Sequence, residues 1–279
     1  MAWVIDRVEP LWLVNGRQTG VDPSDRGLAY GDGLFETMAA ANGSIRWLDY
    51  HLERLADGCA RLAIPPPDAS EIREEIRAYC PRSGRAVLKL MVTRGSGARG
   101  YGPPAQSKPT RILAISAWPS YPAENYSAGV RVSVCGLRLG ETPLLAGLKH
   151  LCRLEQVLAE LELGGSAQQG LLLDGGGRVI GGTRSNVFAV RDGRLLTPAL
   201  DRCGIRGVMR RVVLETAAAA GLAAEECDLT LEDIYSASEL FMTNSLFGIW
   251  PVARLDDRPF QPGPVARELM KRLMVGTDA

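Results

Sequence analysis

Three two-residue turn signals constrain the fold of this 279-residue chain more than any other feature. Asn15-Gly16 and Asn42-Gly43 each follow an apolar run, and Asp192-Gly193 follows the run 186–191. Asn-Gly or Asp-Gly in this setting favours the tight turn of an antiparallel hairpin, because both turn residues adopt positive φ. The sequence therefore predicts antiparallel strand pairs in both halves of the chain.

Helical periodicity alternates with these strands. Apolar residues from Leu48 to Leu62 recur at three- and four-residue spacing, and this stripe ends at prolines 65–67. Further helices are expected over residues 71–79, after Lys149 as far as Gly164, over 208–219 and near the C-terminus. Strands are expected over residues 86–93, 111–117, 130–134, 171–173, 178–180, 186–191, 239–242 and 250–255. This mixture predicts an α+β fold.

The proline-rich segment Trp118-Pro-Ser-Tyr-Pro122 divides the chain unequally. We expect a smaller N-terminal α/β domain over residues 1–117, a linker over 118–122 and a larger C-terminal domain over 123–279. Within the first of these, residues 94–104 contain four glycines, two prolines and two arginines. Such a surface loop can carry functional residues.

The composition excludes several classes of protein. The 32 basic and 32 acidic residues balance, which leaves no overall charge for binding nucleic acid or an anionic membrane. No run of about 18 apolar residues occurs, and Asp6 and Glu9 come too early for a signal peptide, so we expect a cytoplasmic protein. The six cysteines form no Cys-x-x-Cys pair, and with only His51 and His150 no zinc-site spacing can be assembled. Without a Gly-x-Ser-x-Gly motif, a Ser-His-Asp hydrolase is also disfavoured.

Lys149 stands out because the chain has only four lysines. It follows a glycine-containing apolar segment and immediately precedes a predicted helix with Leu151, Leu154, Leu158 and Leu161 on one stripe. Among apolar neighbours, an amine can have its pKa lowered enough to act as a nucleophile, as a Schiff base requires. A solvent-exposed lysine at the start of a helix is the alternative, and spacing alone favours it.

Three small-polar segments in the same half of the chain are candidate phosphate cradles. Gly204 to Arg210 begins the helix predicted at 208–219, whose free N–H groups suit an anion. Thr183 to Asn186 and Thr243 to Ser245 each follow an apolar strand, although ordinary turns explain them equally well. Arg54 can add a charged contact, or can be a plain surface arginine. A phosphate cradle with one isolated lysine suggests pyridoxal 5′-phosphate.

Five motifs along the chain, in order, resemble those of the fold-type IV pyridoxal-phosphate enzymes. That superfamily contains branched-chain aminotransferases, D-amino-acid aminotransferases and aminodeoxychorismate lyases, and its fold has a smaller α/β domain and a larger domain with a mostly antiparallel, barrel-like sheet. The motifs are Arg26-Gly-Leu-Ala-Tyr-Gly-Asp-Gly-Leu-Phe-Glu-Thr37, His51-Leu-Glu-Arg-Leu55, Leu148-Lys-His-Leu-Cys-Arg-Leu-Glu-Gln156, Gly182-Thr-Arg-Ser-Asn186 and Thr243-Asn-Ser245. The third motif, Arg94-Gly-Ser-Gly-Ala-Arg-Gly-Tyr101 and Gly248-Ile-Trp-Pro-Val252 are most similar to the lyases.

The resemblance implies a role for each matching residue. Lys149 would be the Schiff-base lysine and proton carrier, and Thr37 would help to move a proton near the reacting carbons. The residues implied in cofactor binding are Arg54, Lys149, Asn186, Val208, Met209, Thr243, Asn244 and Ser245. The residues implied in substrate binding are Arg99, Tyr101 and Tyr30, with Arg99 reaching the neighbouring subunit's site in a homodimer.

One position departs from the superfamily pattern. Gly181 stands where many members have a glutamate that keeps the pyridine nitrogen protonated. A transaminase needs that electron sink more than a lyase whose product becomes aromatic, so Gly181 favours a carbon–oxygen lyase that forms 4-aminobenzoate and pyruvate from 4-amino-4-deoxychorismate, a step of folate synthesis. An aminotransferase for D-amino or branched-chain amino acids is the alternative, and a non-catalytic phosphate-binding protein is a third reading.

Overall fold

The computed structural model describes residues 11–275, so Asp6 and Glu9 lie outside the described residues. Contacts divide the chain into two units: unit 1 runs to Ser120 and includes Leu148–Cys152, and unit 2 contains Tyr121–Gly147 and Arg153 onward. The expected domains 1–117 and 123–279, with their linker at 118–122, stay a prediction. No helix of the described residues is long and apolar enough to cross a membrane.

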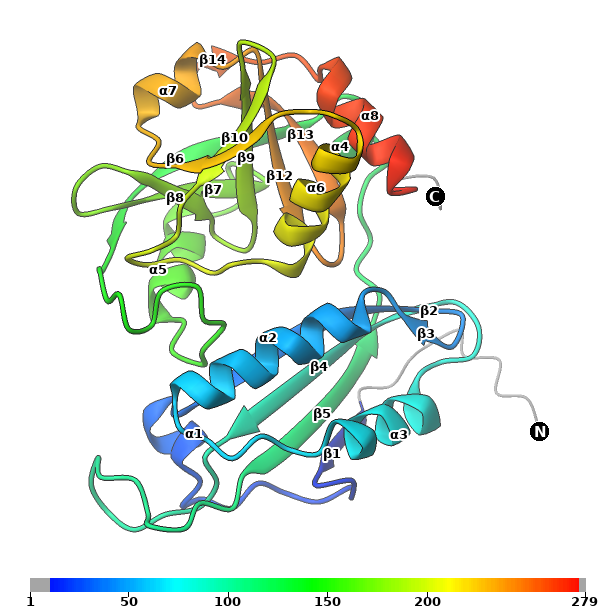
Figure 1. Cartoon of the computed structure of the whole chain (residues 1–279), viewed down its shortest axis with the longest axis vertical. Helices are drawn as coiled ribbons and strands as arrows, with labels where there is room; N and C mark the ends of the chain where they lie inside the picture. Colours follow the sequence, from blue (N-terminus) through cyan, green and yellow to red (C-terminus); the bar gives the residue numbers. More distant parts are fainter. Residues whose placement is uncertain (1–10, 276–279) are drawn as a thin grey trace. The chain divides into compact units, whose positions relative to one another are not determined.

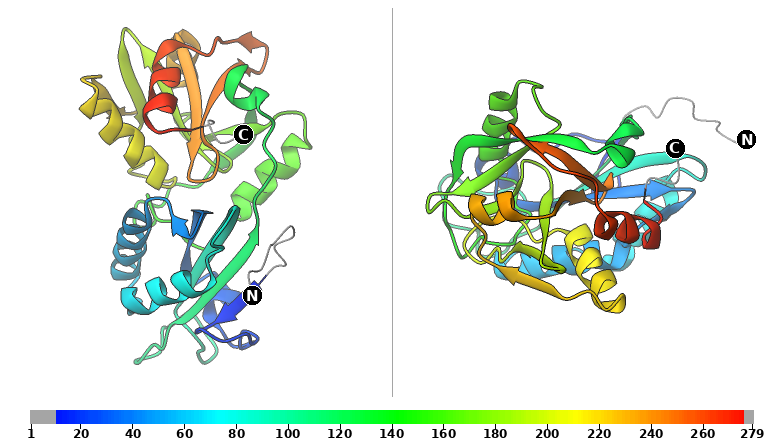
Figure 2. Two further views of the ribbon diagram at one scale, coloured as in Figure 1. Left: turned by 90° about the vertical axis from the view of Figure 1, so that its right-hand side faces the viewer. Right: turned by 90° about the horizontal axis from the view of Figure 1, so that it is seen from above.

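Unit 1 is a five-stranded antiparallel sheet with helices on one face (Figures 1 and 2). Its strands, in the order β1-β5-β4-β2-β3, are β1 (Leu11–Val14), β5 (Thr110–Ala117), β4 (Arg85–Thr93), β2 (Gly33–Ala41) and β3 (Ser44–Ile45). Its helices are α1 (Arg26–Tyr30), α2 (Leu48–Arg61) and α3 (Ala69–Tyr79). The strands β4 and β5 and the two longer helices match the predicted ranges to within two residues; the short helix α1 was not predicted.

The expected turns form as the dipeptides require. Asn15 and Gly16 have φ of 48° and 76°, Asn42 and Gly43 have 49° and 81°, and Asp192-Gly193 has 51° and 72°. Positive φ at both central residues matches the right-handed twist of the flanking strands. The hairpin prediction is therefore confirmed at Asn42-Gly43 and Asp192-Gly193, where β2 pairs with β3 and β9 with β10. At Asn15-Gly16 the turn forms with a single bridge between Val14 and Arg17, and the strand before it pairs with β5 instead.

Unit 2 is built on a nine-stranded sheet in the order β11-β10-β9-β12-β13-β6-β7-β8, with β14 paired to β13. Its strands are β6 (Val130–Leu139), β7 (Gln169–Asp174), β8 (Val179–Gly182), β9 (Asn186–Arg191), β10 (Arg194–Pro198), β11 (Ala224–Cys227), β12 (Glu239–Asn244), β13 (Gly248–Leu255) and β14 (Arg258–Pro259). Its helices are α4 (Glu124–Ser127), α5 (Leu154–Leu163), α6 (Val208–Ala219), α7 (Leu231–Ser236) and α8 (Pro264–Arg272). The strand pairs β10–β11, β13–β6 and β6–β7 are parallel and the other five pairs are antiparallel, so the sheet is mixed but mostly antiparallel, as expected.

Aromatic stacking fills the core of unit 2. Phe188 and Phe241, register partners on β9 and β12, stack at 5.1 Å, and Phe247 stacks on Trp250 at 3.9 Å between ring centroids. Helices α6 and α8 pack on this sheet through β12, and α5 packs on β6 and β7. This rigid sheet presents the ends of β9 and β12, where Asn186 and Thr243 lie.

The helix after Lys149 differs from its expected position and exposure. It begins at Leu154, five residues beyond Lys149, and leaves Leu151 outside. Its buried residues are Ala159 and Leu163, whereas Leu154 and Leu161 are 77% and 71% exposed. The apolar stripe is real, but within this chain it faces away from the core.

Candidate functional site

Strand β2 separates two sets of side chains by simple alternation. Leu34, Glu36 and Met38 are buried, on the face that receives α2, while Phe35 and Thr37 are half-buried on the opposite face. All of these residues except Met38 belong to the expected motif that ends at Thr37. The motif thus supplies a buried carboxylate to one side of the sheet and an aromatic ring with a hydroxyl to the other.

The buried side contains a hydrogen-bonded cluster of Glu36, His51 and Arg54. Arg54 Nε donates to Glu36 Oε1 at 2.8 Å and its Nη2 donates to Oε2 at 2.5 Å, while His51 Nδ1 lies 2.5 Å from the same Oε2. The Arg54 side chain is 14% exposed and those of His51 and Glu36 are at most 1% exposed. Reading Arg54 as a plain surface arginine is therefore wrong, because α2 turns it toward β2.

Electrostatics fixes the charges in this cluster. Burial would raise the pKa of Glu36, but the charge of Arg54 and hydrogen bonds from His51 and Arg54 outweigh it and hold that pKa at about 2. Burial lowers the pKa of His51 more than Glu36 raises it. The carboxylate is thus ionised and His51 is neutral at pH 7, with Nδ1–H donating to Glu36. The cluster fixes the orientation of Arg54.

Neither Glu36 nor His51 is among the site residues expected from the sequence. A signal for them was available: His51 and Arg54 are three residues apart, so they share one face of α2. Glu36 alternates with apolar residues that face the same helix. An acid at a buried strand position needs such basic partners.

Lys149 lies beside β2 and not at the start of a helix. Phe35 N donates to Lys149 O at 2.9 Å, and Leu151 N donates to Gly33 O at 2.9 Å, so residues 149–151 run along the strand. Lys149 Nζ lies 4.2 Å from the centre of the Phe35 ring. The backbone pairing corrects the expected helix-start position and places the amine over an aromatic side chain.

The same sheet face carries Thr37 and a second lysine. Thr37 is the register partner of Lys89 on β4, and Lys89 Nζ lies 5.0 Å from the Phe35 ring centre. Side chains directly opposite in an antiparallel pair are close neighbours. Unit 1 therefore brings Lys149 and Lys89 to one aromatic ring, with Thr37 opposite Lys89 on the neighbouring strand.

The expected substrate-binding residues gather at the glycine-rich loop between β4 and β5. Tyr30, on α1, and Tyr101 have ring centroids 5.4 Å apart, and Gly100 N donates to Tyr30 Oη at 3.2 Å. Arg99 is exposed and pairs with no acidic residue of the described chain. Tyr101 is 85% exposed. The structure thus brings Tyr30 and Tyr101 together and leaves the Arg99 guanidinium open.

Unit 2 joins two of the predicted phosphate cradles around Asn186. Asn186 Nδ2 donates to Ile205 O at 2.8 Å, and a Cβ at Gly207 would clash with Asn186 Oδ1. Gly207 is the N-cap of α6 and makes no side-chain capping bond, so the N–H groups of the first turn, which begins with Val208 and Met209, are not used by a cap. This geometry matches an anion site at a helix N-terminus.

The third predicted cradle, Thr243 to Ser245, lies next to Asn186 because their strands pair. Thr243 on β12 is the register partner of Asn186 on β9. Its hydroxyl donates to Gly248 O at 2.7 Å, so Thr243 would contact an anion through its backbone and not through its side chain. Asn244 accepts from the N–H groups of residues 246 and 247 at 2.9 and 3.0 Å and thereby shapes the turn. Ser245, half-buried in that turn, keeps its hydroxyl available for a ligand.

Gly181 lies on β8 opposite Leu172. A Cβ at Gly181 would lie 3.0 Å from Ser185 O, so a side chain there requires Ser185 to move by a few tenths of an ångström. The backbone of this region thus leaves little room for a side chain at position 181.

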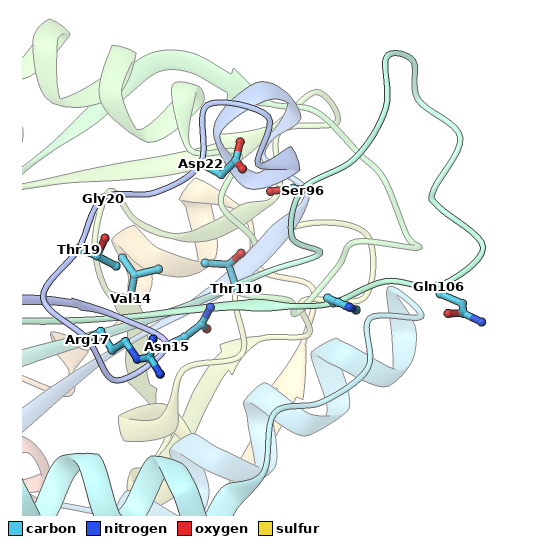
Figure 3. Close-up of a pocket in the computed structure, with 10 residues that line it drawn as sticks. Val14, Asn15, Arg17, Thr19, Gly20, Asp22, Ser96, Gln106 and Thr110 are labelled. Atoms are coloured by element: carbon cyan, nitrogen blue, oxygen red, sulfur yellow. The ribbon is translucent and has the colours of Figure 1, made fainter.

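A shallow pocket of about 660 Å³ lies elsewhere in unit 1, between the first turn and the ends of the glycine-rich loop (Figure 3). Its lining includes Arg17, Asp22, Ser96 and Lys108. None of the expected site residues lines it, and these four side chains are exposed. The volume of this pocket is therefore no evidence that it is the functional site.

Comparison with known proteins identifies the class. The family model of the class IV amino-transferases matches residues 33–255, so the chain belongs to this family. It is 37% identical to an aminodeoxychorismate lyase of Vibrio harveyi over 245 residues, 87% of this chain and 90% of that protein. It is 34% identical to a putative branched-chain-amino-acid aminotransferase of Methanocaldococcus jannaschii over 269 residues, 93% and 92% of the two chains.

A solved structure agrees with this class. The crystal structure of 4-amino-4-deoxychorismate lyase from Pseudomonas aeruginosa matches with a TM-score of 0.90 and 48% identity, over 94% of this chain and 98% of that one. The expected fold-type IV fold is thereby confirmed, and the cofactor of the class is pyridoxal 5′-phosphate.

The residues of each unit fit that cofactor. Its phosphate suits the uncapped helix start at Gly207 and the turn at Ser245 in unit 2. Its aldehyde requires an amine, and Lys149 provides one on a defined face of unit 1.

Proposed function

We propose that this chain is an aminodeoxychorismate lyase that converts 4-amino-4-deoxychorismate to 4-aminobenzoate and pyruvate. The observation that carries the proposal is the 48% identity to the Pseudomonas aeruginosa lyase over nearly the whole of both chains. Gly181, which lacks the carboxylate that a transaminase favours, supports the same conclusion. The reaction is an elimination: the C4–H bond and the C3–O bond of the substrate break, and one substrate yields the two products without water or a redox partner.

Lys149 is assigned to hold the cofactor and to carry the proton. When bound, pyridoxal phosphate withdraws electrons from the carbon that bears the substrate amine. Lys149 removes the proton from C4 and, with Thr37, returns a proton to the departing enolpyruvate, which becomes pyruvate. Phe35, beneath the amine, keeps one side of it apolar. Lys89, opposite Thr37, supplies positive charge for a carboxylate of the substrate.

The phosphate contacts are assigned residue by residue from the family resemblance. Arg54, oriented by Glu36, provides a fixed charge, and the backbone of Val208 and Met209 provides N–H donors. Asn186 holds the loop that leads into this helix start, and the turn Thr243 to Ser245 completes the set. Arg99 and Tyr101, with Tyr30, are assigned to a carboxylate of the substrate.

The lyase assignment is tested by supplying chorismate, glutamine and the preceding synthase and measuring 4-aminobenzoate. The unmodified protein should release 4-aminobenzoate and pyruvate in equal amounts. Lys149→Ala should reduce turnover by at least about a thousandfold, since it removes both the cofactor amine and the proton carrier. The exposed lysine on α8 provides the matched control, and Lys271→Ala should keep full activity. Full activity in Lys149→Ala would sink the assignment.

A class IV aminotransferase is the second candidate, favoured by the 34% identity to the Methanocaldococcus jannaschii protein. Its test is amino-group transfer from D-alanine, L-leucine or L-glutamate to a 2-oxo acid. Rapid transfer without 4-aminobenzoate formation would replace the lyase by this function.

We further propose a homodimer in the cytoplasm, with the exposed stripe of α5 in the interface. Leu154, Val157, Leu158 and Leu161 are each more than half exposed and share one helix face. The six cysteines are free and four are buried, as suits a reducing compartment.

Light scattering on the purified protein tests the dimer. Leu161→Glu places a charge in the stripe and should shift the protein toward the monomer. Met274→Glu, at an equally exposed apolar residue outside α5, should leave the mass unchanged. A dimer that survives Leu161→Glu together with Leu158→Glu would exclude this interface.

A further inference from the structure

One buried arginine holds the tip of the glycine-rich loop. Arg26, the first residue of α1, is 4% exposed. Its Nη1 donates to Gly100 O at 2.9 Å and to Gly102 O at 3.4 Å, and its Nη2 donates to Tyr101 O at 2.8 Å. Its Nε donates to Asp32 Oδ2 at 2.8 Å. A single side chain therefore binds three successive backbone carbonyls of a segment that has no regular secondary structure.

The same short stretch of chain also binds the base of the loop. Arg26 N donates to Gly95 O at 2.9 Å, and Gly97 N donates to Ser24 O at 3.2 Å. A Cβ at Gly97 would lie 2.9 Å from Arg26 Cδ, and a Cβ at Gly95 would clash with the backbone of Lys108. The glycines are needed here for close approach, and not only for mobility.

Asp32 links this arginine to a second one. Arg94 Nε donates to the same Asp32 Oδ2 at 2.8 Å, while its Nη1 and Nη2 donate to the carbonyls of Ala63 and Leu62 just beyond α2. Desolvation opposes the ionised form of Asp32, yet Arg94 and Arg26 lower its pKa overall. Asp32 therefore stays charged and fixes the direction in which the Arg26 guanidinium points.

We propose that Arg26 is a positioning residue that presents Arg99 and Tyr101 to a carboxylate of the substrate, an inference that rests on the proposed function. Arg99 precedes Gly100, the first carbonyl that Arg26 holds, and makes no ion pair within the described chain. Stacking of the Arg26 guanidinium over Tyr30, at 4.9 Å, brings the Tyr30 ring into the same assembly. Fixing the backbone on the C-terminal side of Arg99 reduces the entropy lost when Arg99 binds an anion.

Limited trypsin digestion of the holoprotein measures the order of the loop directly. Trypsin cleaves after arginine, and the Arg99–Gly100 bond lies next to the carbonyls that Arg26 holds. Arg26→Gln should raise the initial rate of cleavage at this bond by about tenfold or more, because local opening no longer breaks three charge-assisted hydrogen bonds. Arg26→Lys should also raise it, since lysine keeps the charge beside Asp32 but cannot reach three carbonyls at once.

Kinetics of the same variants tests the link to the substrate. Both should raise KM about tenfold or more while kcat changes less than threefold, because a disordered Arg99 weakens substrate binding and leaves the reacting groups in place. Arg111→Gln is the matched control: Arg111 is 12% exposed in unit 1, and its guanidinium donates to Glu71 and Glu75 and not to the carbonyls of residues 100–102. It should change neither cleavage after Arg99 nor KM.

The possible failures differ from one another. Native cleavage at Arg99 in folded Arg26→Gln would overturn the positioning role. Faster cleavage with an unchanged KM would overturn its link to the substrate. Absence of lyase activity from the unmodified protein would overturn the proposed function, and the trypsin experiment would still report on the loop.

Discussion

The two units hold their candidate anion-binding groups by opposite means. In unit 1, Arg54 is oriented by ionised Glu36, which His51 also contacts, all in a buried cluster. In unit 2, Asn186 binds a backbone carbonyl, and its close approach depends on the missing Cβ of Gly207. The first arrangement depends on charge, so it should respond to pH. The second depends on close packing of neutral groups, so it should respond to added volume and not to pH.

The largest effect should come from removing the charge in unit 1. Glu36→Gln should lower the free energy of unfolding at pH 7 by roughly 3 kcal/mol, since it leaves buried Arg54 without its carboxylate. The pKa of Glu36 is about 2 in the folded protein, against an ordinary value of 4.5. The stabilisation is therefore complete above about pH 4.5 and is lost as the pH falls toward 2. Urea unfolding at pH 7 and pH 3 should show the variant approaching the unmodified protein at the lower pH.

An exposed glutamate of α3 provides the control for this experiment. Glu74→Gln removes one carboxylate from unit 1 without touching the cluster, and should change stability little at either pH. A deficit in Glu36→Gln that stays the same from pH 7 to pH 3 would show that shape, and not charge, stabilises the cluster. The contrast between the two units would then disappear.

The sequence predicted the helices and strands of both units better than the contacts between residues of the candidate sites. Hairpin turns and helical stripes are local, so Asn42-Gly43 and the helix 208–219 follow from neighbouring residues alone. The position of Lys149 was missed because its pairing with Phe35 joins residues more than a hundred positions apart. Local spacing predicted a helix start at Lys149, whereas hydrogen bonds to the distant strand β2 determine its position.

The site shows the same limit. Arg54 and Asn186 were found as single residues, from local sequence and a family resemblance, but Glu36 was not, since only the packing of α2 on β2 shows which buried acid Arg54 meets. The close contact of Gly207 with Asn186 could not be predicted either, because a glycine before a helix is equally typical of an ordinary N-cap. Its role depends on the side chain that lies opposite.

A smaller effect, and a test of the packing in unit 2, is expected from Gly207→Ala. Its Cβ would clash with Asn186 Oδ1, so Asn186 must move away from Ile205 or the start of α6 must shift. We expect a loss of about 2 kcal/mol in the free energy of unfolding, equal at pH 7 and pH 3 because no ionisable group is involved. Pyridoxal phosphate should also bind at least about tenfold more weakly, as the helix start is displaced. Titration with the cofactor and urea unfolding measure the two effects.

Gly175→Ala is the matched control, because a Cβ there has no neighbour within 4 Å and its backbone lies outside the left-handed region. It should leave both cofactor affinity and stability nearly unchanged. Native cofactor affinity in Gly207→Ala would mean that the first turn of α6 tolerates displacement, and Asn186 would then have to be assigned a role other than holding this loop. Loss of cofactor affinity with native stability would instead show that the contact between Gly207 and Asn186 matters for cofactor binding and not for the stability of unit 2.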